Sequence, residues 1–297
     1  MDVPEEQKII DLHTHSTASD GSNAPEDIPA LAVEQGVAAV ALTDHDTVSG
    51  INAFLEAAGS YPQLTAIPGV ELAALYGARE IHIVGLFLDH TSPEFNDFLA
   101  RQREVRRRRN EEIRVKLNIL GYPASWDEEE FSGRDPSSIG RPHFAAFLCR
   151  KYGFSGPQEV FKKLIGNSCP AYVPRKLPVC QEAIAAIHSA GGVAVWAHPI
   201  YRDKNESRFL RRVAKHLTAA GLDGIEGYYS LFSSNETKMV LECAGNNGLA
   251  VSGGSDYHGA NSSGIRLGVG MGGLRVPFAL LDALREKHRL VQERYSR

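Results

Sequence analysis

Short apolar runs recur along the chain, and most are followed by a segment whose apolar residues are three or four positions apart. Runs of this length indicate buried strands, and the helical spacing indicates helices that cover a sheet. Strands that alternate with helices predict an α/β fold with a parallel sheet, either open or closed into a barrel. Right-handed crossovers would then place the carboxyl end of every strand on one rim. The expected strands are residues 8–13, 37–42, 64–72, 80–88, 192–196, 222–229 and 249–253.

The alternation of strands and helices is interrupted between residues 90 and 177. A long helix is expected over residues 98–120, because apolar residues fall on one stripe there, and Gly121-Tyr122-Pro123 would end it. We therefore expect a barrel formed by residues 1–90 and 177–297, with residues 91–176 as a helical insert that contributes substrate contacts. Helices are also expected over 24–35 and 179–190 in the barrel, over 142–151 and 157–165 in the insert, and over 277–295 at the carboxyl end.

The 297 residues are 43% hydrophobic and 23% charged, and the formal net charge of −4 gives no overall attraction for nucleic acid or membrane. The four cysteines are far apart and form no C-x-x-C pair, which favours a reduced cytosolic setting. The acidic amino terminus does not resemble a signal peptide, and no apolar run nears the roughly 20 residues that span a bilayer. We expect a cytoplasmic protein with no membrane partner and no stable nucleic-acid partner.

The strongest chemical signal is Asp11-Leu12-His13-Thr14-His15, at the expected end of the first strand. Side chains alternate across a strand, so His13 and His15 should point to the same side and Thr14 to the other. Two imidazoles on one side can share a divalent metal ion. A single pair of this kind is nevertheless more often an ordinary polar feature.

Histidine and carboxylate side chains also occur at or near the ends of the other expected strands. Any one of them could be a polar loop residue or a hydrogen-bonded histidine. Six strand ends of this kind, that of the first strand included, together favour one shared metal site, and the absence of a thiolate suits zinc, manganese or iron rather than a closed structural zinc site. The positions are His45 in LTDHDT, Glu71 in GVEL, His82 in IHIVG, His198 in AHP, and Asp256 and His258 in GGSDYHG.

In their order along the chain, HTHSTASDG, LTDHDT, GVEL, IHIVG, AHP and GGSDYHG resemble the motifs of the polymerase and histidinol phosphatase (PHP) family. The resemblance covers residues 9–90 and 178–259. It implies a distorted (β/α)7 barrel, similar to a TIM barrel, with up to three metal ions at the rim where the strands have their carboxyl ends.

The resemblance also implies a set of ligands for each ion, with Glu71 as a bridge between two of them. Asp20 stands where many family members have a histidine, which can alter the preference for a metal. We expect two to three divalent ions, with manganese as the first choice and zinc or iron as alternatives. The first ion would be held by His13, His15, Glu71 and Asp256, the second by Glu71, His82 and His198, and the third by Asp20, His45 and His258.

Hydrolysis of a phosphate ester is also the chemistry that such ions favour, because they lower the pKa of bound water and neutralise phosphate oxygens. No Ser-His-Asp elbow or Gly-rich nucleotide loop indicates another mechanism. His198 or His258 could protonate the leaving oxygen, and the sequence leaves that choice open. The remaining acids of these motifs, which are expected to orient imidazoles rather than to bind metal, are Asp11, Asp44 and Asp46.

Within the expected insert, Gly140-Arg141-Pro142-His143 is the segment best suited to contact a substrate. A proline at the start of a helix would leave Arg141 beside backbone N–H groups, where it could clamp an anion or simply face solvent. With the later Ala171-Tyr172-Val173-Pro174, this segment resembles the PHP subfamily whose helical insert accompanies activity on nucleotides. That resemblance implies removal of the 5′-phosphate from nucleoside 3′,5′-bisphosphates, trimming of short RNA 5′ ends, and contacts from Arg141 and His143 to the second phosphate.

The basic run 106–109 raises the question of an RNA surface. Glu104 can pair with Arg108 one helical turn away, and Glu111 and Glu112 follow directly. These acidic neighbours favour a solvated helix face, with an RNA end lying over that face as the alternative.

We therefore expect an enzyme that hydrolyses the 5′-phosphate of a small nucleotide or a short RNA end. The near alternative is another phosphomonoesterase of the family, such as a histidinol phosphatase, which would lack the G-R-P-H contacts. An amidohydrolase would carry a metal-bridging lysine after a middle strand, and no lysine follows the strands here. A non-catalytic accessory domain is disfavoured by the complete ligand set, and the oligomeric state stays open.

Overall fold

The computed structural model describes residues 7–202, 206–262 and 264–295. The chain divides into two compact units, one formed by Met1–Phe98 with Leu177–Arg297 and the other by Leu99–Lys176. The boundaries expected from the sequence, at residues 90 and 177, stay a prediction about functional domains. No helix within the described residues has both the length and the apolar composition that crossing a bilayer requires.

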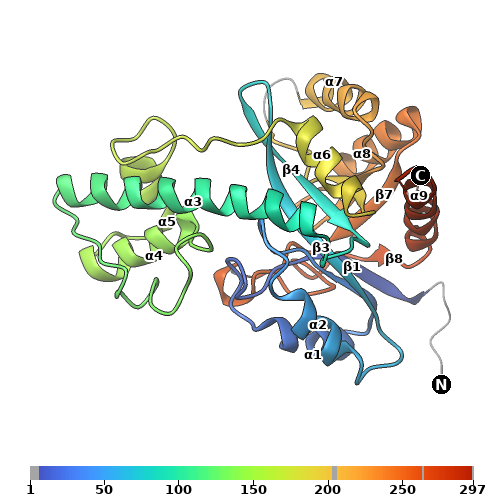
Figure 1. Ribbon diagram of the computed structural model, residues 1–297, viewed down its shortest axis with the longest axis horizontal. Coiled ribbons are helices and arrows are strands. Elements are labelled where there is room, and N and C mark those ends of the chain that lie inside the picture. The colour runs from blue at the N-terminus through green and yellow to red at the C-terminus, as the bar shows by residue number, and fades with distance from the viewer. Residues whose placement is uncertain (1–6, 203–205, 263, 296–297) are drawn as a thin grey trace. The chain divides into compact units, whose positions relative to one another are not determined.

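The first unit is built on one sheet of eight strands in the order β7-β6-β5-β4-β3-β2-β1-β8 (Figure 1). The backbone N–H of His15 donates to Tyr257 O at 2.8 Å and that of Asp256 donates to His13 O at 2.9 Å. These bonds join the end of β1 to the segment after β7, so the sheet is a nearly closed barrel. The strands are β1 Ile9–Thr14, β2 Val37–Leu42, β3 Thr65–Tyr76, β4 Arg79–Leu86, β5 Val193–Ala197, β6 Gly224–Tyr229, β7 Ala250–Gly254 and β8 Val276–Pro277.

The expectation that all strands are parallel is wrong. Strand β4 runs antiparallel to both β3 and β5, and the short β8 runs antiparallel to β1. The cause is a hairpin: Tyr76 pairs with Arg79, and Gly77 takes a φ of 60° in the two-residue turn between them. Glycine adopts this left-handed conformation without the clash that a side chain would cause. The third strand therefore continues four residues beyond its expected end at residue 72.

Helices of the first unit cover the strands with apolar faces. In α7 the buried residues Leu210, Val213 and Leu217 are three or four positions apart and Phe209 lies four positions before Val213, so they form one stripe. Helix α8 begins at a capping box, in which Ser233 Oγ accepts from Glu236 N and the Glu236 carboxylate accepts from Ser233 N. The helices are α1 Ile28–Glu34, α2 Ile51–Ala58, α6 Cys180–Ser189, α7 Glu206–Ala219, α8 Ser234–Asn247 and α9 Leu280–Tyr295, with short 3₁₀ turns at Pro25–Asp27 and Gly259–Asn261.

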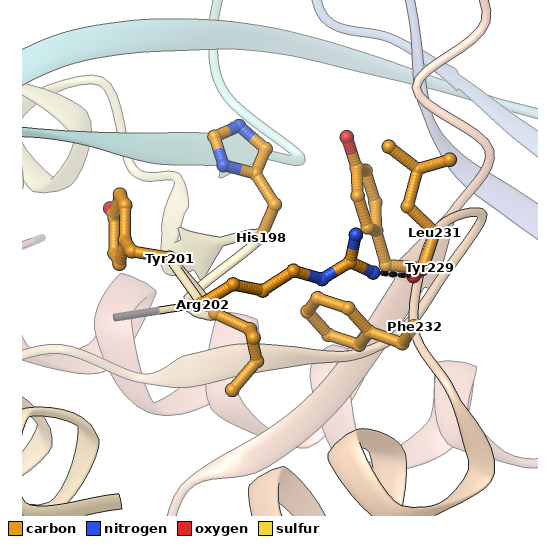
Figure 2. A pocket seen from close by; sticks show the side chains of 7 residues that line it. His198, Tyr201, Arg202, Tyr229, Leu231 and Phe232 are labelled. Atoms are coloured by element: carbon orange, nitrogen blue, oxygen red, sulfur yellow. Dashed lines mark hydrogen bonds between the residues drawn. The ribbon is translucent and has the colours of Figure 1, made fainter. Parts of the chain in front are cut away.

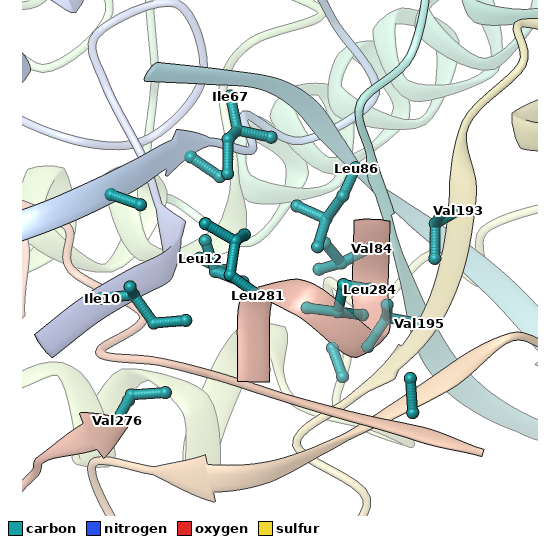
Figure 3. Packing of buried hydrophobic residues seen from close by; sticks show 14 residues of the cluster. Ile10, Leu12, Ile67, Val84, Leu86, Val193, Val195, Val276, Leu281 and Leu284 are labelled. Carbon is teal, nitrogen blue, oxygen red and sulfur yellow. The ribbon is translucent and has the colours of Figure 1, made fainter. Parts of the chain in front are cut away.

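The core of the first unit joins the strands to α9 (Figure 3). Val84 and Leu86 share a strand face with His82, because alternate residues of a strand point to the same side. The side chains of Leu281 and Leu284 from α9 complete this cluster and are fully buried. Its strand members are Ile10, Leu12, Ala39, Ala41, Ile67, Val84, Leu86, Val193, Val195, Ala197, Ala250 and Val276.

The second unit is helical and has a core of its own. Helix α3, Pro93–Ile119, starts in the first unit, and within the second unit it buries Ile113 and Leu117. Leu120, which the sequence places on the buried stripe, is exposed because the helix ends before it. The other helices are α4 Arg141–Tyr152, α5 Pro157–Val160 and a π-helical turn Phe161–Ile165.

Leu284→Ala should lower the free energy of unfolding by about 2–5 kcal/mol, because it leaves a cavity in a fully buried cluster. Urea unfolding followed by circular dichroism measures this change. Leu290→Ala, on an exposed position of the same helix, is the matched control and should stay within about 0.5 kcal/mol of the wild type. Equal losses in the two variants would contradict the packing described for α9.

Candidate metal centre

A single buried carboxylate, that of Glu71, lies at the centre of the site. Its side chain is 1% exposed. Five imidazole nitrogens surround its two oxygens, and they come from three strands or strand ends, β1, β4 and β5, and from the loop after β2. The distances are 3.4 Å from His13 Nε2, 3.3 Å from His15 Nε2 and 3.0 Å from His45 Nδ1 to Oε2, and 2.8 Å from His82 Nδ1 and 3.0 Å from His198 Nε2 to Oε1.

Two aspartates extend the cluster on either side of His15. Asp256 Oδ1 lies 3.3 Å from His15 Nε2 and 3.6 Å from His13 Nε2. Asp20 Oδ1 lies 3.3 Å from His258 Nε2, and its Oδ2 lies 3.8 Å from His45 Nε2. The structure thus brings together all nine side chains singled out in the sequence as metal ligands.

Strand geometry explains how distant segments meet here. Glu71 and His82 lie in the interior of β3 and β4, so the expectation that both stand at strand ends is wrong. In the antiparallel register Glu71 pairs with Val84 and Ala73 with His82. Residues 71, 73, 82 and 84 therefore share one face of the hairpin, which carries both ligands into the same space.

Two ligand positions have unusual backbone conformations. His198 has a φ of 29° and Asp256 a φ of 55°, in the left-handed region that non-glycine residues rarely adopt. Such conformations cost on the order of 1–3 kcal/mol each and persist where the surroundings determine them. His198 directly follows β5 and Asp256 lies two residues after β7, and the turn of the chain aims their side chains back at Glu71 or at the histidines beside it.

Protonation in this cluster is governed by charge more than by burial. Burial raises the pKa of the Glu71 carboxyl, but the neighbouring imidazolium groups, His82 first, hold that pKa well below its usual range. Burial lowers the pKa of His15, but Asp256 and Glu71 outweigh it and raise the pKa to about 10. Glu71 similarly raises the pKa of His82 to about 10 against the effect of burial. The carboxylates are therefore ionised, and in the metal-free chain protons supply the balancing positive charge.

The donor set fits divalent metal ions. Three groups of side chains offer ligand atoms within 4.8 Å of one another. His13 Nε2 and both ring nitrogens of His15 are buried without a hydrogen bond of normal geometry, although they face carboxylates. A cation between nitrogen and oxygen donors would satisfy these atoms, and such donors suit manganese, zinc or iron. The groups are His15, Asp20, His45 and His258; His13, His15 and Glu71; and His45, Glu71 and His82.

Comparison with known proteins gives the family. A PHP domain model matches residues 11–131. The chain is 38% identical over 251 residues to the 5′-3′ exoribonuclease Rnm of Salmonella typhimurium. This alignment covers 84% of this chain and 85% of that protein. This chain belongs to the PHP family.

Two further relatives agree with that assignment. The 3′,5′-nucleoside bisphosphate phosphatase of Chromobacterium violaceum is 32% identical over 87% of this PHP chain and 90% of its own length. A solved structure from Bifidobacterium adolescentis, proposed to be a metal-dependent phosphoesterase, superposes with a TM-score of 0.78 at 27% identity over 94% of this chain and 95% of that one. The protein is a metal-dependent phosphoric ester hydrolase, and the expected distorted TIM-like barrel is confirmed.

The sequence analysis missed two residues that support the PHP site. Glu226 Oε1 lies 3.0 Å from His13 Nδ1, and its Oε2 accepts from the backbone N–H of His198 at 2.6 Å. The Tyr229 hydroxyl donates to Asp256 Oδ2 at 2.9 Å. Both come from β6, where a lone glutamate inside an apolar run is itself a signal, because a buried acid requires partners.

The roles expected for two other acids are wrong. Asp11 accepts from the backbone N–H groups of Ser255 and Gly268 at 2.8 and 2.7 Å, so it holds backbone rather than an imidazole. Asp44 binds the backbone and hydroxyl of Ser16 and the hydroxyl of Ser19, which fixes the loop before Asp20. For Asp46 the described contact is its backbone N–H, which donates to Glu71 O at 3.0 Å, and its role toward an imidazole stays a prediction.

The two predicted substrate contacts lie in the second unit. Arg141 is the first residue of α4, and its Nη1 donates to Asn167 Oδ1 at 3.4 Å. His143 Nδ1 accepts from the backbone N–H of Gly140 at 3.0 Å, so this side chain caps the helix. A capping role was not expected, and contact of either side chain with phosphate stays a prediction.

The basic run of α3 is not one continuous surface. Arg107 and Arg108 both bind Glu104, at 2.7 and 2.6 Å, on an exposed face. Arg109 donates to Val173 O at 2.9 Å, and Arg106 is buried. The expected solvated face therefore holds for the middle of the run, while the outer two arginines are part of the packing of the helix.

Binding of Mn²⁺ at pH 8 should release protons from this PHP site. Imidazoles must be neutral to bind metal, and the pKa of His15 and of His82 is raised to about 10 in the metal-free protein. Both are therefore protonated at pH 8 and should release roughly one to two protons. Titration calorimetry in two buffers of different ionisation enthalpy counts them, and the apparent affinity should rise between pH 7 and pH 9. A pH-independent affinity would contradict this account.

Glu226→Gln should weaken Mn²⁺ binding by about 10–100-fold, because an amide oxygen cannot replace both carboxylate contacts that orient His13 and His198. Calorimetry on the folded variant measures the loss. Glu242→Gln, the same change at an exposed position of α8, is the control and should leave the affinity unchanged. If the two variants bind metal equally well, Glu226 does not orient the ligands.

Proposed function

We propose that this PHP enzyme removes the 5′-phosphate from nucleotides, prefers nucleoside 3′,5′-bisphosphates, and trims short RNA 5′ ends. The observation that carries the proposal is the convergence of nine nitrogen and oxygen ligands, Glu71 among them, in a chain whose relatives are named as an exoribonuclease and a bisphosphate phosphatase. Both names describe cleavage of a phosphate ester next to a nucleoside. Manganese is the proposed metal, with zinc and iron as alternatives.

The geometry supports the assignment of ligands to two or three ions. Divalent ions bound here would supply a water of lowered pKa and would neutralise charge on the phosphate oxygens. His15 lies between the Glu71 group and the Asp20 group, and His45 likewise faces carboxylates of both. The proposed sets are His13, His15, Glu71 and Asp256; Glu71, His82 and His198; and Asp20, His45 and His258.

Other side chains of the site would orient ligands and hold protons. Burial and the charge of Asp256 raise the pKa of the Tyr229 phenol, so its hydroxyl keeps its proton and donates to Asp256. Burial and His15 lower the pKa of His258, but Asp20 and Asp256 outweigh them and raise it. His258 or His198 is the proposed proton donor to the leaving oxygen.

Removal of metal should abolish hydrolysis of adenosine 3′,5′-bisphosphate, and added Mn²⁺ should restore it. His15→Ala should lower turnover by orders of magnitude, because charge stabilisation of several kcal/mol is lost with a central ligand. Phosphate release and metal content are measured on the same samples, with circular dichroism as the control for folding. Full activity in exhaustively chelated protein would falsify the mechanism.

Arg141→Ala should reduce kcat/KM for adenosine 3′,5′-bisphosphate by about 1.5–3 kcal/mol of transition-state binding, as for a lost hydrogen bond to a charged group. The effect on adenosine 5′-monophosphate should be much smaller, because that substrate lacks the second phosphate. Arg108→Ala, at an exposed arginine of the same unit, is the control and should change neither value. Equal losses of kcat/KM on both substrates would show that Arg141 does not bind the second phosphate.

A further inference from the structure

A hollow of about 190 Å³ adjoins the metal-ligand cluster within the first unit (Figure 2). One of its walls is His198, whose Nε2 lies 3.0 Å from Glu71, so the hollow begins where the ligand cluster ends. Its other walls come from the segment after β5 and from the end of β6 with the loop that follows. They are Ile200, Tyr201, Arg202, Tyr229, Leu231 and Phe232.

The size of the hollow limits what it can hold. Pockets for whole drug-sized ligands measure roughly 300–1,000 Å³, whereas this one has room for about six water molecules at roughly 30 Å³ each. A complete nucleotide would not fit, but one planar ring system would. A phosphate ester bound at the metal cluster could therefore place one ring of its leaving group here.

The walls are those of a stacking site. The rings of Tyr229 and Phe232 have centroids 5.1 Å apart at an interplanar angle of 61°, and the Tyr229 ring lies 5.6 Å from that of His198. Tyr229 is held by its hydrogen bond to Asp256, so one wall is fixed by the ligand cluster itself. Aromatic side chains bind nucleobases by stacking, which contributes about 1–3 kcal/mol per base and tolerates any base.

One cation borders these rings. The Arg202 guanidinium lies beside the Tyr229 ring in Figure 2, with Nε donating to Glu236 Oε1 at 3.1 Å and Nη2 donating to Leu231 O. Arg202 has a φ of 55°, so its backbone is in the left-handed region as well. A guanidinium held at two of its nitrogens still offers donors to ring nitrogens and carbonyl oxygens, which are the acceptors that nucleobases carry.

We infer that this hollow is the nucleobase subsite of the enzyme, in which the base of the nucleotide being hydrolysed stacks on Phe232 and Tyr229 and meets Arg202 at its edge. The inference rests on the proposed function, because it assumes a nucleotide whose 5′-phosphate lies at the ligand cluster. Stacking requires that a base is present but does not distinguish one base from another. The subsite therefore favours nucleotides over sugar phosphates without selecting among the bases.

The test compares two 5′-phosphate esters that differ only in the base, adenosine 5′-monophosphate and ribose 5-phosphate. In Phe232→Ala the ratio of their kcat/KM values should fall by about 5–150-fold, which corresponds to about 1–3 kcal/mol of stacking. Phe232→Trp should keep the ratio near that of the wild type, since it retains an aromatic face. Leu290→Ala, which removes an exposed apolar side chain of α9, is the matched control.

The two ways of failing are distinguishable. A wild-type enzyme that hydrolyses neither ester would overturn the proposed function, and binding of adenosine, measured by calorimetry, would still report on the hollow. Weaker adenosine binding in Phe232→Ala than in Leu290→Ala supports the subsite. An unchanged kcat/KM ratio in Phe232→Ala, or adenosine binding equal in the two variants, would overturn it.

Discussion

The whole site depends on how a buried negative charge is balanced. The Glu71 carboxylate has almost no contact with water, and an isolated ionised carboxylate in such surroundings would be strongly unfavourable. The chain meets this constraint with five imidazoles from four segments, since His13 and His15 share the end of β1. Positive charge in that ring can come from protons or from metal ions, and the two compete for the same nitrogen lone pairs. Metal binding and proton release at this site are therefore thermodynamically linked.

The same constraint explains why the barrel departs from regular parallel geometry. A strand that ended at residue 72, followed by a helix, would not bring His82 back to Glu71. The hairpin through Gly77 does so with two residues of turn, because an antiparallel partner places its side chains directly beside those of the preceding strand. The barrel is distorted at the point where the central carboxylate needs another partner. Glu226 on β6 also supports the ligands, because its carboxylate holds the imidazole ring of His13 and the backbone of His198 in place.

Much of the site could be predicted from sequence, because each ligand lies in a short segment of strand character and strand rims bring such segments together. The strands themselves were recognised within a few residues, apart from the two-residue β8. The sequence did not predict the direction of the strands, because the periodicity of apolar residues is the same in parallel and antiparallel strands. The segment that makes the hairpin turn is Tyr76-Gly77-Ala78-Arg79. The supporting contacts of Glu226, Tyr229 and Asp11 depend on partners more than 25 residues away, which local patterns do not encode. The capping bond of His143 is local, yet the sequence analysis did not expect it, and contact of His143 with phosphate stays a prediction.

The seam between β1 and the segment after β7 has a consequence for how the molecule is made. Asp11 binds the backbone of Ser255 and Gly268, partners 244 and 257 positions later in the chain. The first strand can pair with β2 early, but its contacts on the other side need residues up to 268, and contacts of such large separation form slowly. Until then the histidines of the first strand and Glu71 belong to an unfinished cylinder in which Asp256 and His258 are missing. The complete ligand set can therefore form only after Asp256 and His258 have been translated, whereas the two groups that contain Glu71 come entirely from earlier segments.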